Sequence, residues 1–149
     1  MKNYYVGLDV HSRESVFVVQ DDAGVSLARG AIPTTASGLL QLRDSCGLPA
    51  GTSVALETGT SAFFVARELV RLELKPVVID AHEVRRKAHR PEQKSDTRDA
   101  LELCEGLRRG FIARWCTCRV LRSAICAPRY PAAATSFVSR PLRLMPSNG

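Results

Sequence analysis

The order of the apolar segments constrains the fold of this chain more than any other feature. Residues 4–20 hold two segments rich in β-branched and aromatic side chains, and the polar stretch His-Ser-Arg-Glu-Ser joins them. Two such segments with a short polar connection indicate a β-hairpin. A second turn, residues 21–24, leads to a third segment of the same kind, residues 25–32, which ends at Pro33. The chain is therefore predicted to open with three antiparallel strands.

Strands and helices alternate in the middle of the chain. Ser37 is expected to cap a short amphipathic helix that ends near Asp44. Residues 52–57 and 75–80 are predicted to be strands, and residues 60–74 between them place apolar side chains at helical spacing. A strand, a helix and a strand in this order form a βαβ unit with parallel strands, so the predicted fold is α/β, with a mixed sheet and flanking helices. The apolar stripe of the middle helix is predicted to belong to the core.

A final helix is predicted to begin at Asp96, with Ser95 as its N-cap and Gly110 at its end. The segment before it, residues 82–94, is the densest basic stretch of the chain. Basic side chains bind the phosphates of nucleic acids without reading their sequence, and we expect this segment to do so. The residues assigned to this role are Arg85, Arg86, Lys87, Arg90 and Lys94.

The character of the sequence changes after residue 113. Residues 1–113 carry 15 basic and 15 acidic side chains, so the net charge of +6 comes from six arginines in residues 114–149. This last part also holds three of the five cysteines and four prolines, and it shows neither a helical nor a strand period. We therefore expect a domain of residues 1–113 and a tail, residues 114–149, that is disordered or arises from a change of reading frame. A natural basic tail that binds nucleic acid is the alternative.

Composition bears on the compartment in which the protein works. The chain has 45% apolar residues, which is ordinary for a globular domain. An odd number of cysteines and the lack of a signal-peptide pattern predict a reducing, cytoplasmic environment. No apolar run approaches the roughly 18 residues that a membrane-spanning helix needs, so we expect no membrane partner.

Four acidic residues are the candidates for chemistry. Asp9 and Glu57 fall at the ends of predicted strands, while Asp96 and Asp99 share one face at the start of the last helix. Carboxylate oxygens suit Mg²⁺ or Mn²⁺, and a pair of such ions holds the attacking and leaving oxygens of a phosphodiester in line. An aspartate within an apolar strand, as at Asp9, costs desolvation free energy unless a cation or hydrogen bonds compensate it. The sequence thus predicts a metal site for chemistry on nucleic acid.

Each of these residues also has an ordinary structural interpretation. The charge of Asp96 stabilises a helix N-terminus by about 0.3–1 kcal/mol, and Asp99 has arginines near it in sequence with which to pair. Polar residues beside the acids are interpreted as turn residues with local hydrogen bonds, not as ligands. They are His11, Ser12, Thr58 and Thr60.

Three stretches of the chain resemble a known protein family. They are GLDVHSRESVFVV, VALETGTSAFFVARELV and KPVVIDAHEVRRKAHRPEQKSDTRDALEL. They are similar to the amino-terminal domain of the DEDD transposases of bacterial insertion sequences, which resembles Holliday-junction resolvases of the RuvC type. The resemblance covers residues 4–113 and rests most on Gly-Leu-Asp-Val, Leu-Glu-Thr-Gly and Lys-Ser-Asp-x-x-Asp-Ala. It implies a ribonuclease-H-like fold in which Asp9, Glu57, Asp96 and Asp99 form the catalytic, metal-binding tetrad.

The resemblance also implies an activity and partners. The activity is metal-dependent cleavage and transfer of DNA strands in transposition, with DNA and a structured guide RNA as partners and a homo-oligomer as the assembly. A carboxy-terminal domain of the family supplies a catalytic serine that joins covalently to DNA. Relatives continue the last helix into a long helical connection, where this chain has its Arg-, Cys- and Pro-rich stretch from Trp115. We therefore expect the amino-terminal domain alone to be inactive in full transposition.

Two other functions fit parts of the sequence. A non-catalytic module that binds DNA or RNA would modulate an intact transposase, either by occupying its nucleic acid or by forming mixed oligomers. Sugar kinases and actin-like ATPases also open with a strand that carries Gly-x-Asp and a polar turn. They require in addition a Gly-rich phosphate loop and a duplicate domain, for which this chain is too short.

Overall fold

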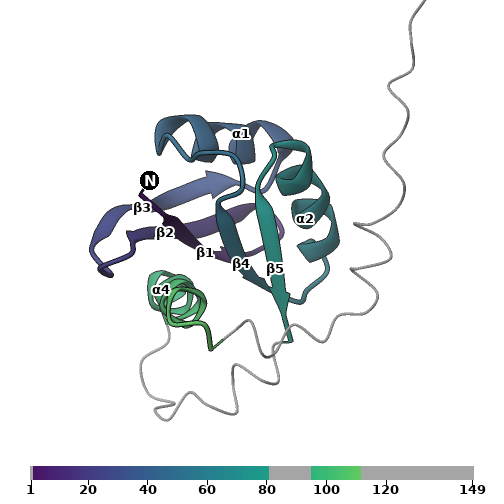
Figure 1. Ribbon diagram of the computed structural model, residues 1–149. Coiled ribbons are helices and arrows are strands. Elements are labelled where there is room, and N and C mark those ends of the chain that lie inside the picture. The colour runs from purple at the N-terminus through teal and green to yellow at the C-terminus, as the bar shows by residue number, and fades with distance from the viewer. Residues whose placement is uncertain (1, 81–94, 112–149) are drawn as a thin grey trace, which may run out of the picture.

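The computed structural model describes residues 2–80 and 95–111 (Figure 1). The predicted basic segment, residues 82–94, and the predicted tail, residues 114–149, lie outside them. No helix within the described residues is long and apolar enough to cross a membrane. The elements follow in the order β1 (Tyr4–Val10), β2 (Glu14–Asp21), β3 (Ser26–Pro33), α1 (Ala36–Ser45), β4 (Ser53–Glu57), α2 (Ala62–Arg71), β5 (Lys75–Ile79) and α4 (Asp96–Arg108).

The five strands form one sheet in the order β3-β2-β1-β4-β5. β1 pairs with β2, and β2 with β3, in the antiparallel sense that the hairpin pattern predicted. β4 is parallel to both of its neighbours, β1 and β5, because α2 carries the chain back across the sheet between β4 and β5. The mixed sheet confirms the α/β prediction, and the arrangement is a ribonuclease-H-like fold.

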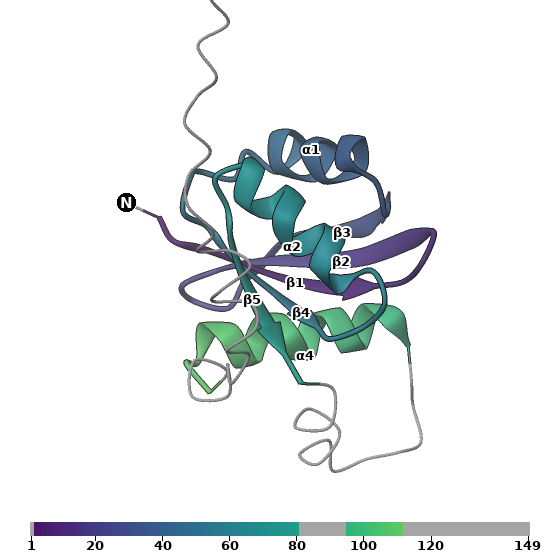
Figure 2. The ribbon, with the colours of Figure 1, turned by 90° about the vertical axis from the view of Figure 1, so that its right-hand side faces the viewer.

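Helices cover both faces of the sheet. Figure 2 shows α1 and α2 on one face and α4 on the other. Side chains alternate along a strand, so Val6 and Leu8 of β1 and Val54 and Leu56 of β4 point toward α1 and α2, where all four are fully buried. Ala55 points the opposite way and packs against α4. The central strands are thus buried on both sides, which explains why they are apolar almost throughout.

The N-terminus of α1 differs from the prediction. Thr35, not Ser37, is the N-cap: its backbone is extended and its Oγ1 accepts a hydrogen bond of 3.1 Å from the amide of Gly38. Ser37 lies within the first turn, where its hydroxyl is 3.0 Å from that of Thr35. Gly38 is required because a Cβ atom there would lie 2.0 Å from the carbonyl oxygen of Pro33. The close approach of β3 to α1 therefore fixes where the helix begins.

The predicted helix 60–74 is shorter at both ends, and its C-terminus has a defined cause. Glu73 adopts a left-handed backbone conformation, with φ of 61°. The amides of Glu73 and Leu74 turn back onto the carbonyls of Val70 and Leu69, at 3.0 and 2.9 Å. This is the Schellman pattern, which most often has glycine at the left-handed position. A glutamate there gives no sequence signal that the helix ends.

The prediction that the whole apolar stripe of this helix is core is wrong for Phe63, Phe64 and Val70. Their side chains are 44%, 37% and 38% exposed. A helix with 3.6 residues per turn turns only one face to the sheet, so contiguous apolar residues cannot all be buried. The residues of α2 that are buried are Ala62, Val65, Ala66 and Leu69.

Candidate metal centre

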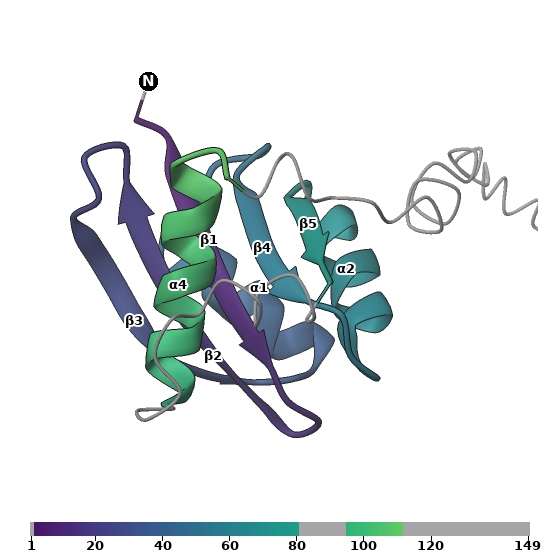
Figure 3. The same cartoon turned by 90° about the horizontal axis from the view of Figure 1, so that it is seen from below.

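The position of α4 on the sheet depends on Gly7 in the middle of β1. A Cβ atom at Gly7 would lie 1.9 Å from the carbonyl oxygen of Ala100 and 2.6 Å from the amide nitrogen of Cys104. Only glycine leaves room for the helix backbone at this distance. Figure 3 shows α4 lying across β1 on this face of the sheet. The helix therefore rests directly on the strand that carries Asp9.

Two contacts define the register between α4 and β1. The thiol of Cys104 donates to the carbonyl oxygen of Tyr5 at 3.2 Å, and Ala100 lies over Gly7. Burial raises the pKa of the Cys104 thiol to about 11, so it stays protonated and able to donate. Two residues along β1 rise about 6.6 Å, and four residues along α4 rise about 6 Å. Going from Tyr5 to Gly7 along the strand therefore matches going back from Cys104 to Ala100 along the helix. One more such step places Asp96 level with Asp9.

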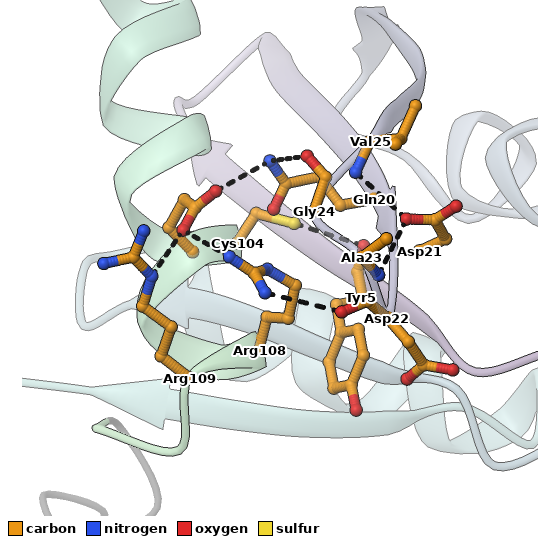
Figure 4. A network of polar contacts seen from close by, with 11 residues as sticks. Tyr5, Gln20, Asp21, Asp22, Ala23, Gly24, Val25, Cys104, Arg108 and Arg109 are labelled. Atoms are coloured by element: carbon orange, nitrogen blue, oxygen red, sulfur yellow. Dashed lines mark hydrogen bonds and ion pairs between the residues drawn. The ribbon is translucent and has the colours of Figure 1, made fainter.

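The C-terminal half of α4 is anchored to the β2–β3 turn (Figure 4). The buried Gln20 amide donates to Glu105 Oε1 at 3.2 Å and to the Gly24 carbonyl at 3.3 Å. Glu105 also forms ion pairs of 2.9 Å with Arg108 and Arg109. These contacts fix the helix at the end remote from Asp96, so its position on β1 is set at two places.

Asp9 is largely enclosed, with 13% of its side chain exposed. Its Oδ2 accepts a hydrogen bond of 2.9 Å from Nε2 of His11. Burial raises the pKa of Asp9, the charge and hydrogen bond of His11 oppose that rise, and the negative charges of Asp99 and Asp96 add to it. The raised pKa therefore results first from burial of the carboxyl group and then from the neighbouring negative charges, which His11 offsets only in part.

Asp96 and Asp99 lie in the first turn of α4, and the predicted N-cap, Ser95, is confirmed. The Ser95 hydroxyl accepts from the amide of Arg98 at 3.3 Å. The side chain of Asp96 is 64% exposed, and its Oδ2 lies 3.7 Å from Nε2 of His11. One ligand atom each from Asp9, His11 and Asp96 thus lie within 4.8 Å of one another. Asp99 is half-buried and is not a member of this cluster.

Glu57 reaches the same face of the sheet from the neighbouring strand. Leu56 pairs with Leu8 in the parallel register, so Glu57 is level with Asp9. Its side chain follows the alternation of Ala55 and points to the side of the sheet that α4 covers. Like Asp99, Glu57 lies outside the cluster of mutually close ligand atoms. The structure therefore brings the four predicted acids to one region, where Asp9 and Asp96 share a cluster with His11.

His11, predicted to be a turn residue and not a ligand, lies in the cluster with Asp9 and Asp96. The available signal was its spacing, because Asp9 and His11 are two apart at the end of a strand, where alternate side chains point to the same side. The predicted nucleic-acid-binding residues Arg85, Arg86, Lys87, Arg90 and Lys94 lie outside the described residues.

The donor atoms fit a divalent cation. In an octahedral shell with ligands at 2.0–2.1 Å, neighbouring donors are about 3.0 Å apart and opposite donors about 4.2 Å. The distances from His11 Nε2 to Asp9 Oδ2 and to Asp96 Oδ2, 2.9 and 3.7 Å, fall within or close to that range. One imidazole accompanies carboxylates that repel one another, and a cation would relieve that repulsion. The site is therefore chemically suited to Mg²⁺ or Mn²⁺.

Comparison with known proteins gives the family. A search of curated proteins found no match to the chain. Residues 6–114 match the family model for DEDD transposases of the IS110 type, which is described as a transposase. Because this match runs over most of the chain, from β1 to beyond the end of α4, the protein belongs to the IS110-type family of DEDD transposases.

Proposed function

We propose that the protein is the catalytic-type domain for DNA strand cleavage and transfer in transposition, that it binds Mg²⁺ or Mn²⁺ through Asp9, Glu57, Asp96 and Asp99, and that it does not complete transposition alone. Its family makes it the amino-terminal domain of a DNA transposase, with DNA as a partner and dependence on a divalent metal. One observation carries the proposal for these residues. The docking of α4 on Gly7 sets Asp96 level with Asp9, although the two lie at opposite ends of the described sequence.

The roles of the side chains follow from the elements that hold them. Asp9 is fixed by a central strand that is buried on both sides, which suits a ligand whose position must not vary. Asp96 and Asp99 lie where the positive end of the α4 dipole favours anions. Glu57 would complete the set from β4. A bound divalent ion supplies charge neutralisation at the phosphate and activates the attacking oxygen.

The basic segment is proposed to hold the nucleic acid beside this site. It connects Asp80, which follows β5, to Ser95, which caps α4. Ile79 at the end of β5 is the register partner of Glu57, so both attachment points of the segment lie next to the acidic residues. Arginine and lysine side chains there would bind phosphates of DNA or of a structured guide RNA.

The proposal extends to the organisation of the protein. Residues 1–113 would form the domain and residues 114–149 a basic tail, a division that lies largely outside the described residues. We expect metal-dependent binding and nicking from the domain in a homo-oligomer. Full strand transfer would require in addition the serine domain that the family resemblance implies.

The test compares Asp9→Asn with Asp44→Asn on branched DNA, in the presence of Mg²⁺ or EDTA. Asp44 is a matched control because it is an exposed aspartate of α1 that pairs with Arg43, on the other side of the sheet. Loss of even an outer-shell partner of a metal ligand costs about 10–100-fold in affinity or activity. We therefore expect Asp9→Asn to reduce Mg²⁺-dependent nicking by about 100-fold or more and Asp44→Asn to leave it unchanged.

A non-catalytic role is the outcome that would overturn this proposal. If the protein bound branched DNA with a strong salt dependence, showed no Mg²⁺-dependent nicking and behaved identically after Asp9→Asn, the carboxylates would have no chemical role. The protein would then be a DNA- or RNA-binding module that modulates an intact transposase. Thermal unfolding of both variants controls for loss of the fold.

A further inference from the structure

His11 places a nitrogen donor between two carboxylates that come from different elements. Its Nε2 lies 2.9 Å from Oδ2 of Asp9 on β1 and 3.7 Å from Oδ2 of Asp96 on α4. Half of its side chain, 51%, is exposed, so packing does not account for the orientation of the ring. Asp9 and Asp96 are both proposed ligands. One ligand atom from each of them and one imidazole nitrogen lie within 4.8 Å of one another, close enough to bind one ion.

The backbone that carries His11 is held in place. The hydroxyl of Thr34 donates to the His11 carbonyl oxygen at 2.7 Å and lies 2.7 Å from the hydroxyl of Ser15, which is fully buried. The amide of Thr34 donates to the carbonyl of Arg13 at 2.9 Å. The β1–β2 turn is therefore tied to the residues between β3 and α1. A side chain on such a turn is positioned as a ligand must be.

The chemistry of imidazole distinguishes it from the neighbouring ligands. Mg²⁺ takes oxygen donors in near-octahedral geometry. Imidazole nitrogen suits transition metals, and the affinity of mixed nitrogen and oxygen sites rises along the series that begins at Mn²⁺. An added imidazole therefore favours Mn²⁺ over Mg²⁺ relative to a site made only of carboxylates.

We propose that His11 is itself a ligand of the metal site, through Nε2, and that it biases the site toward Mn²⁺. This assignment rests on the proposed metal site, to which it adds one donor. In the metal-free protein the hydrogen bond between His11 Nε2 and Asp9 Oδ2 already holds the two donor atoms at the separation of neighbouring ligands, and the metal ion would take the place of the shared proton. Asp9, His11 and Asp96 form the compact part of the site.

The number of histidines makes the test direct. The chain has three, at positions 11, 82 and 89, so the double variant His82→Asn/His89→Asn leaves His11 as the only imidazole. The full chain is prepared without a histidine tag and loaded with Mn²⁺. Pulsed electron paramagnetic resonance then reports whether a ¹⁴N nucleus of imidazole is coupled to the bound ion. We expect that coupling in the double variant and its loss when His11→Ala is added.

Affinity provides the second measurement. Binding of Mn²⁺ and Mg²⁺ is titrated for the wild type, for His11→Ala and for His89→Ala as the matched control. We expect His11→Ala to weaken Mn²⁺ binding by about 10-fold or more, from the cost of losing even an outer-shell group, and to weaken Mg²⁺ binding less. His89→Ala should change neither. Circular dichroism checks that His11→Ala is folded. The nitrogen coupling is measured first in the double variant, which retains His11, so that result does not depend on how His11→Ala folds.

The outcomes separate the two claims. Bound Mn²⁺ without nitrogen coupling in the double variant would overturn the assignment of His11 and leave the carboxylate site intact. Coupling that persists after His11→Ala would assign the nitrogen to another group and also overturn it. If Mn²⁺ did not bind to the wild type, the metal site of the proposed function and the assignment of His11 would fail together.

Discussion

Gly7 lacks a side chain, and the backbone of α4 occupies the space that a Cβ atom would need. The carbonyl oxygen of Ala100 would lie 1.9 Å from such an atom. The same contact sets the distance between Asp9 and the first turn of α4. A single residue thus couples the packing of the last helix to the geometry of the candidate metal site.

Replacing Gly7 by alanine should therefore both destabilise the protein and weaken metal binding. Overpacking of this kind costs about 1–3 kcal/mol, and the backbone atoms involved cannot move aside as a side chain would. Urea unfolding and Mn²⁺ titration measure the two effects. Gly59→Ala is the control, because no atom lies within 4 Å of a Cβ there, and its effect should stay within about 0.5 kcal/mol. Equal effects of the two substitutions would contradict the role of Gly7.

Asp9 gives the metal-free protein a defined pH dependence. Burial and the nearby Asp99 and Asp96 raise its pKa above the ordinary 3.8, despite the opposing effect of His11, so the native state holds this proton to higher pH than the unfolded chain does. The free energy of unfolding then falls as the pH rises from the ordinary pKa of 3.8 through the raised pKa of Asp9. In EDTA, Asp9→Asn should be more stable than the wild type near pH 7, and the difference should shrink near pH 3. If the difference in stability between the variant and the wild type were the same at both pH values, the raised pKa of Asp9 would be contradicted.

At the scale of elements, two kinds of contact hold α4. In the middle of the helix, at Ala100 and Cys104, its backbone packs closely on Gly7 of β1, whereas near Glu105 a polar network with a buried member, Gln20, holds it. Burial acts to raise the pKa of Glu105, but hydrogen bonds from Arg108 and Gln20 lower it further than burial raises it. The stability that this carboxylate contributes is present above its ordinary pKa and is lost as pH falls through the lowered value.

Two substitutions in α4 separate this network from ordinary surface charge. Glu105→Ala removes a hydrogen-bond acceptor of the buried Gln20 amide, which costs about 1–3 kcal/mol when the group is left unsatisfied. Glu102→Ala removes an exposed carboxylate that lies 3.5 Å from Arg98, and such a pair contributes about 0.3–0.5 kcal/mol. Thermal or urea unfolding compares them at neutral pH. If both variants lost the same stability, the network would not anchor the helix.

At the scale of the whole molecule, parallel pairing brings distant parts of the chain to one region. β4 lies between β1 and β5, so Glu57, Asp9 and the end of β5 meet on the face that α4 covers. The basic segment begins and ends at these elements. Binding of nucleic acid by the whole protein should therefore depend on that segment and on salt.

Double substitution of Arg85 and Arg86 by alanine tests this dependence. Each phosphate contact contributes a slope of about −0.9 to the plot of log K against log salt concentration. We expect the double variant to bind branched DNA more weakly and with a slope less steep by up to about 2. Arg43→Ala, on α1 across the sheet from α4, is the control and should leave the slope unchanged. Fluorescence anisotropy at several salt concentrations measures it, and an unchanged slope in the double variant would rule out phosphate contacts by these arginines.

Much of the fold was predictable because its signals are local. The alternation of apolar residues in β1 and β2, the turn at 21–24 and the N-cap at Ser95 each depend on neighbours in sequence. Local patterns failed where a distant contact decided the outcome. Thr35 caps α1 because β3 approaches Gly38, and the exposed Phe63 shows that an apolar run does not say which face of a helix meets the sheet.

The order of strands and helices, the positions of the four acids on them and the resemblance to the family follow from the sequence alone, because periodicity and motifs are properties of short stretches. Which donors meet depends on tertiary packing. The approach of α4 to Gly7 brings Asp96 into a cluster with Asp9 and His11, a cluster that does not include Glu57 or Asp99. That selection rests on contacts between residues far apart in the chain, which no local pattern records.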